Sequence, residues 1–173
     1  MATNLEFIKS LTPNGSSSSL SITDVFSAEY NVYFVTYFIT SDSGSPKDVH
    51  LRFINSSDTI VTNSNYDYAY AQMNSGGSFT DTGAVNQDKV TGMLGATDFA
   101  PEGASGKFEV YSPFSSSDFT FVTQQAANSH NNTRAGWKGI AVLTETTSIT
   151  GLNIFLSSTN PTDASNITVY GVK

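Results

Sequence analysis

The segment from Asn31 to Thr40, NVYFVTYFIT, constrains the fold of this chain more than any other. Nearly every residue in it is β-branched or aromatic, which suits a pleated strand better than a helix. Side chains alternate across a strand, so both faces of this one would be apolar. A strand with two apolar faces is typical of the interior of a sheet. We therefore predict that residues 31–40 form a central strand.

Short alternating segments follow one another along the rest of the chain, separated by turn residues. Breaks every 8–12 residues are typical of antiparallel sandwiches and barrels. We predict one domain, 1–173, built as an antiparallel β-sandwich of jelly-roll type with about ten strands. The expected strands are 3–9, 20–26, 31–40, 49–53, 66–73, 89–94, 107–112, 118–124, 136–145, 148–157 and 166–172, with a further short strand at 59–62. Residues 78–106 are otherwise poorly patterned, and 128–134 predict a polar loop.

Composition excludes several classes of protein. Charged residues make up 13% of the chain and the net charge is −7, which argues against nucleic-acid binding because no positive stripe is present. The chain has no cysteine, so it has no disulfide framework and no thiol nucleophile. We find neither a signal peptide nor an apolar run of the roughly 18 residues that span a bilayer. We expect synthesis in a cytoplasm and no membrane insertion.

No motif in the sequence indicates catalysis. The two histidines, His50 and His130, are predicted to lie on the surface, and no GxSxG elbow marks a serine beside them. The in-strand acids Glu6, Glu109 and Glu145 look solvent-facing, which argues against paired glycosidase carboxylates. We predict no catalytic residue, no cofactor and no metal ligand. A calcium ion held by loop oxygens and a small hydrolase that uses His50 and His130 remain as alternatives.

Aromatic residues are the one feature that could mark a binding surface. Tyr66, Tyr68 and Tyr70 lie two apart, so they would form a row on one face of a strand, and Trp137 is the only tryptophan. Tyrosine and tryptophan are favoured at interfaces and stack on sugars. These four residues are therefore candidates for an interface or for glycan stacking. The alternative, which we favour, is that the row packs inside the sandwich.

Several segments resemble small virion structural proteins of marine tailed phages, cyanophages especially. The resemblance is carried by LEFIKSLT, VFSAEYNVYFVTY, PEGASGKFEVYSPFSSSDFTFVTQQ, GWKGIAVLTETTSITGLNIFLSS and the terminal ITVYGVK, and runs over nearly the whole chain. It implies a non-enzymatic component of the virion with a jelly-roll-like fold. It carries over no catalytic or ligand residue.

The predicted domain fills the chain from its first strand to its last, so we expect attachment through its own surface. This favours a capsid decoration (cement) protein that is assembled in a bacterial cytoplasm, and we expect it to be a homotrimer. Its partners would be the major capsid protein or tail proteins. The alternative is a tail-associated fibre, a knob or a receptor-binding carbohydrate-binding module that recognises a host surface glycan.

Overall fold

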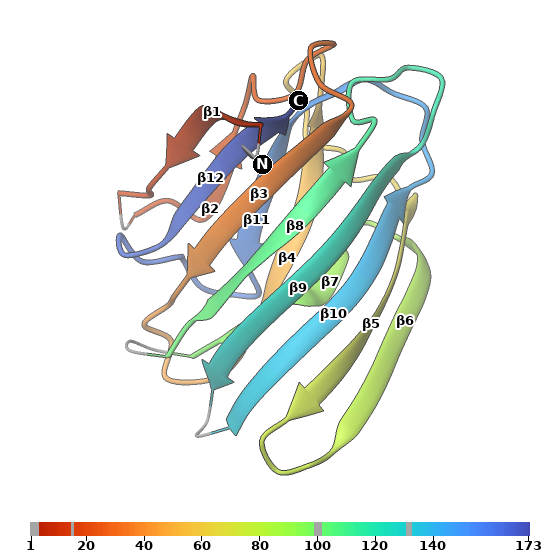
Figure 1. The fold of residues 1–173 in the computed structure, drawn as a ribbon. Coiled ribbons are helices and arrows are strands. Elements are labelled where there is room, and N and C mark those ends of the chain that lie inside the picture. The colour runs from red at the N-terminus through yellow and green to blue at the C-terminus, as the bar shows by residue number, and fades with distance from the viewer. Residues whose placement is uncertain (1–3, 15, 99–101, 131–132) are drawn as a thin grey trace.

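The computed structural model describes the chain except for residues 1–3, 15, 99–101 and 131–132. No helix occurs among the described residues, and their strands pair antiparallel in two facing sheets (Figure 1). The strands of the described part are β1 (Leu5–Leu11), β2 (Ser19–Ile22), β3 (Val32–Ile39), β4 (Lys47–Asn55), β5 (Tyr66–Asn74), β6 (Phe79–Gln87), β7 (Val90–Thr97), β8 (Ala104–Tyr111), β9 (Thr120–His130), β10 (Thr133–Leu143), β11 (Ile149–Leu156) and β12 (Asn166–Val172). The prediction of an all-β antiparallel sandwich is confirmed.

The two sheets differ in size. Sheet A has the strand order β1-β12-β3-β8-β9-β10-β5-β6, and sheet B has the order β2-β11-β4-β7. The chain passes from one sheet to the other at every connection except β5–β6, β8–β9 and β9–β10. Those three connections leave β9, β10, β5 and β6 as extra strands on one side of sheet A, where Figure 1 shows the sheet extending beyond its partner. The narrower designation of jelly roll stays a prediction.

The predicted central strand lies inside sheet A. β3 pairs with β12 on one side and with β8 on the other, as its two apolar faces indicated. The side chains that pack toward sheet B are buried, namely Tyr33, Val35, Tyr37 and Ile39. The side chains on the opposite face are only half-buried. The outer face of sheet A is thus partly apolar although no described element packs over it.

A bulge in β7 fills the space beneath the extra strands of sheet A. Residues 92–95 leave the pairing between β7 and β4. Gly92 and Gly95 have φ angles of 71° and 91°, which other residues rarely adopt. Between them, Met93 and Leu94 are fully buried, and β7 packs against β5, β8, β9 and β10. The bulge therefore supports the part of sheet A that sheet B is too narrow to cover.

Several local predictions were wrong, among them the second strand expected over 20–26, since β2 ends at Ile22. Three others concern later segments. The poorly patterned region contains the full-length strand β6, and the polar loop expected at 128–134 is largely the paired ends of β9 and β10. The short strand expected at 59–62 is a single bridge between Ile60 and Ile54. The first two of these three errors share a cause: these segments have few apolar residues, and pairing with a neighbouring strand holds them extended whatever their own propensity.

Candidate binding groove

The tyrosine row faces the interior of the sandwich. Tyr66, Tyr68 and Tyr70 lie on one face of β5, as their spacing predicted, and all three pack against the core. Tyr66 is fully buried and so is Trp137 on β10, whereas Tyr68 and Tyr70 are half-buried. Tyr66 and Trp137 have no exposed ring face on which a sugar could stack. Tyr66 therefore packs inside the sandwich, as the favoured alternative predicted, and Trp137 does so too.

The half-buried pair is also tied to its neighbours. The rings of Tyr68 and Tyr70 stack with 6.4 Å between centroids and 11° between planes. A Cβ placed at Gly92 would lie 2.7 Å from the hydroxyl oxygen of Tyr70, so this tyrosine packs on the backbone of the β7 bulge. Burial raises the pKa of Tyr70. These two side chains support the extra strands of sheet A from below.

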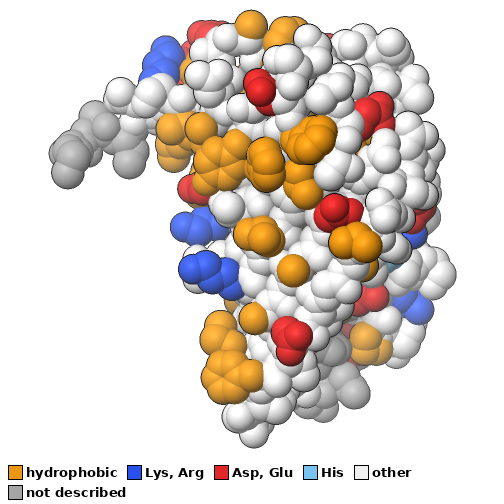
Figure 2. All heavy atoms as spheres, turned by 90° about the vertical axis from the view of Figure 1, so that its right-hand side faces the viewer, with side chains coloured by type: hydrophobic (Ala, Val, Ile, Leu, Met, Phe, Trp, Pro, Cys, Tyr) orange, Lys and Arg blue, Asp and Glu red, His pale blue; other side chains and the backbone are white. Residues whose placement is uncertain are grey.

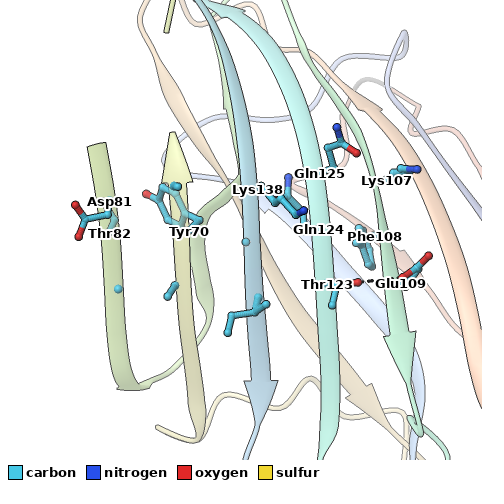
Figure 3. A pocket seen from close by; sticks show the side chains of 15 residues that line it. Tyr70, Asp81, Thr82, Lys107, Phe108, Glu109, Thr123, Gln124, Gln125 and Lys138 are labelled. Atoms are coloured by element: carbon cyan, nitrogen blue, oxygen red, sulfur yellow. Dashed lines mark hydrogen bonds between the residues drawn. The ribbon is translucent and has the colours of Figure 1, made fainter. Parts of the chain in front are cut away.

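The most pronounced hollow lies on the opposite side of those strands. It crosses the outer face of sheet A from β8 to β6 and has a volume of about 760 Å³ (Figure 3). A second hollow of about 610 Å³ adjoins it and shares Ala69, Gly83, Thr123 and Ile140 with the first. We call the two together the outer groove. Ala69 and Ala71 on β5 and Gly83 on β6 leave room for it, beside the carboxylate of Asp81 on β6 and longer side chains on β8, β9 and β10.

One stretch of the outer groove is polar. Lys107 on β8 pairs with Gln125 on β9, which pairs with Lys138 on β10, so the three side chains form a row across the sheet. All three are exposed, and Figure 3 shows them on three adjacent strands. Lys107 also lies over the ring of Phe34, with its Nζ 5.7 Å from the centroid. The row presents two cations and an amide on an acidic protein.

A carboxylate lies next to this row but is already engaged. Glu109 accepts a hydrogen bond from the hydroxyl of Thr123, at 3.1 Å, and a second one from the hydroxyl of Tyr111, at 2.5 Å. The carboxylate holds the pKa of the Tyr111 phenol above its usual range. These bonds hold Glu109 against its own neighbours on β8 and β9.

The other stretch of the outer groove is apolar. Phe121, Ile140 and Val85 are 51%, 61% and 64% exposed, unusually high values for large apolar side chains. Phe121 and Ile140 line the second hollow together with Val85, and alanine and glycine lie between them. Figure 2, which views the molecule from the side of β6, shows hydrophobic side chains gathered beside lysine or arginine. The outer groove thus joins an apolar surface to a cationic one.

His50 was predicted to lie on the surface, and this is wrong. It points away from the core of the sandwich, yet only 5% of it is exposed. Its ring lies 5.0 Å from that of Phe155, and Arg52 covers the same phenylalanine. Burial lowers the pKa of His50, Asp48 acts against this shift, and Lys89 and Arg52 add to it. Phe155, on the neighbouring strand β11, covers the His50 ring. Alternation along β4 shows which face His50 lies on, but not whether a residue of another strand covers it.

Replacing His50 with leucine is expected to reduce the loss of stability on mild acidification. The folded-state pKa of His50 lies below the unfolded value of about 6.5, so its contribution is complete above that pH and is lost as the pH falls toward the folded pKa. The melting temperature, measured at about pH 7.5 and about pH 5.5, should fall less in His50→Leu than in the wild type. An equal fall in both proteins would contradict this.

The predictions about a second histidine, a metal site and catalysis stay predictions. The side chain of His130 lies outside the described residues, so its predicted surface position stays a prediction. No group of three or more metal-ligating side chains occurs in the described part of the chain. Among the same residues, no helix is long and apolar enough to cross a membrane.

Sequence analysis missed the outer groove. The outward polar positions on β8, β9 and β10 were visible as alternation, but nothing in the sequence pairs Lys107 with Gln125 or Gln125 with Lys138. Comparison with protein-family models, with curated proteins and with solved structures found no match to this chain.

Proposed function

We propose that the protein is a non-enzymatic structural component of a phage virion, exposed on the particle as a capsid decoration protein. The resemblance of the sequence segments supports this, as does the β-sandwich. The observation that carries the proposal is an exposed apolar surface at the free edge of sheet A. We call it the β1 edge, defined by Leu5, Phe7, Phe34, Tyr170 and Val172.

The β1 edge has the composition of a contact surface. Phe7 is 61% exposed, and its ring lies 6.1 Å from that of Tyr170, which lies 6.4 Å from Phe34. Leu5 and Val172 are exposed beside them on paired strands. Contiguous apolar patches on a protein surface mark interaction sites, and an edge strand offers unpaired backbone groups. This surface suits a protein that is held on a particle by its own domain.

The connectivity supports the jelly-roll designation as part of the same proposal. Strands β1-β12-β3-β8 of sheet A face β2-β11-β4-β7 of sheet B, and along the chain each of these strands is followed by one from the other set, except that β4 is followed by β7 of the same sheet. The hairpins built from β5, β6, β9 and β10 are additions to sheet A. Double-sheet jelly rolls of eight strands occur in viral capsid proteins and in lectins.

Replacing Phe7 with lysine is expected to weaken attachment to the particle by about tenfold, because a central apolar contact residue would become charged. Recombinant protein would be incubated with phage particles that lack it, sedimented and quantified per particle. The matched control is Phe79→Lys on β6, since Phe79 is 75% exposed at the opposite edge of sheet A. Attachment of Phe7→Lys at the level of the wild type would contradict the proposal.

Two further measurements bear on placement and on assembly. Antibody labelling of intact particles should decorate the capsid and not the tail. Light scattering after size exclusion should give the mass of a trimer, the state expected of a symmetric accessory. Labelling confined to the tail would favour the fibre or knob alternative over capsid decoration.

A second candidate function is carbohydrate binding. The observation that favours it is the outer groove, an open hollow with apolar and polar side chains side by side. Sugars need both kinds of contact, because each ring has an apolar face and a rim of hydroxyl groups. The groove and the β1 edge adjoin on the outer face of sheet A, where Lys107 of the groove lies over Phe34 of the β1 edge, and the groove extends from there toward β6.

A further inference from the structure

We propose that the outer groove binds an acidic sugar chain, with Lys107 and Lys138 holding its anionic groups. The inference rests on the second candidate function, carbohydrate binding, and does not depend on where the protein is placed on a particle. It names the class of glycan: a polysaccharide whose sugars carry carboxylate or sulfate groups.

The charge of the two lysines is available to a ligand. In the described part of the chain, ion pairs engage Arg52 and Lys89 with Asp88, and Lys173 with Glu6. No ion pair there engages Lys107 or Lys138, and both side chains are exposed. On a protein with a net charge of −7, two cations without ion pairs in one row are a local exception among the described residues. An anionic ligand would complement them.

The spacing of the lysines suits two anionic groups carried along one chain. Lys107 and Lys138 lie two strands apart, with Gln125 between them. Adjacent strands are separated by about 4.8 Å, so the two backbone positions are about 10 Å apart. Each lysine carries its charge at the end of a flexible side chain, so competition by free sulfate tests whether one small ion can engage both. Two anionic groups carried along a polymer can each meet one lysine.

The rest of the outer groove supplies the contacts that a sugar ring needs. The amide of Gln125 can both donate and accept hydrogen bonds between the lysines. Ile140 and Phe121 offer exposed apolar surface next to the row. Lys107 is held over Phe34, which limits the freedom it loses on binding. The groove crosses several strands, which gives room for several sugar units.

Binding of a hexamer of galacturonic acid is the direct test. At low ionic strength the full chain should bind it with measurable heat, and the amide resonances of β8, β9 and β10 should shift. A neutral hexamer of glucose should bind about tenfold more weakly or not at all, because charge-assisted hydrogen bonds would be missing. A sulfated hexasaccharide, tested in parallel, decides whether carboxylate or sulfate is preferred.

The double variant Lys107→Gln/Lys138→Gln should lower the affinity by about tenfold. The matched control, Lys9→Gln/Lys47→Gln, removes the same charge elsewhere and should leave the affinity unchanged. Three results would overturn the inference: neither acidic hexamer binds, both double variants lose affinity equally, or free sulfate competes as well as the hexamer. Particle attachment is measured separately with Phe7→Lys, so failure of the glycan proposal and failure of the attachment proposal are distinguishable.

Discussion

Replacing Tyr66 with alanine is expected to lower the free energy of unfolding by about 3–5 kcal/mol, the range for deleting a large buried aromatic ring. Tyr66 is fully buried and stacks on Phe53 with 6.3 Å between ring centroids and 17° between planes. Its hydroxyl donates to the carbonyl of Val61 at 3.0 Å and accepts from the amide of Phe53 at 2.9 Å. Urea unfolding followed by fluorescence would measure the change.

Two further variants separate packing from ligand contact. Tyr66→Phe keeps the ring but leaves two buried backbone groups without the hydroxyl, so a smaller loss of about 1–3 kcal/mol is expected. Ile140→Ala removes an exposed apolar side chain from the outer groove and should change stability by less than about 0.5 kcal/mol. If Tyr66→Ala unfolded at the same urea concentration as the wild type, the buried placement of the tyrosine row would be contradicted.

The second large effect is expected at Gly151 on β11. A Cβ at this position would meet the carbonyl oxygen of Ile22 and would lie 3.0 Å from the Cα of Thr23. Both atoms belong to the backbone at the end of β2, which pairs antiparallel with β11, and just beyond it the amides of Val25 and Phe26 donate to the carbonyl of Thr150. Gly151→Ala should therefore cost about 3 kcal/mol or more through overpacking.

Gly136 on β10 provides the matched control for that substitution. A Cβ there would meet Met73 at 3.6 Å and the carbonyl of Ala126 at 3.7 Å, which are ordinary contacts. Gly136→Ala should leave stability unchanged or raise it slightly, because alanine restricts the unfolded chain more than glycine does. Thermal melts of the two variants would compare them directly. Equal melting temperatures would contradict the close approach of the Ile22 and Thr23 backbone to Gly151.

The predicted elements that succeeded had strong local signals. β3 and the tyrosine face of β5 were readable because every second side chain is large and apolar or aromatic, and period-two alternation is a property of the strand alone. Where the signal was weak, as in β6 and the ends of β9 and β10, the prediction failed. Those segments are extended because a neighbouring strand supplies their hydrogen bonds. Which two strands pair cannot be predicted from the sequence of either one alone.

By itself, the sequence determined the class of the fold, an all-β antiparallel sandwich, because its aromatic and β-branched alternation and its turn residues are local properties. The tertiary structure decided which strands became neighbours. It buried Tyr66 and His50, and it assembled Lys107, Gln125 and Lys138 from three strands into one row. Strand order depends on contacts between segments far apart in the chain, which no periodicity records, and the candidate binding surface exists only through that order.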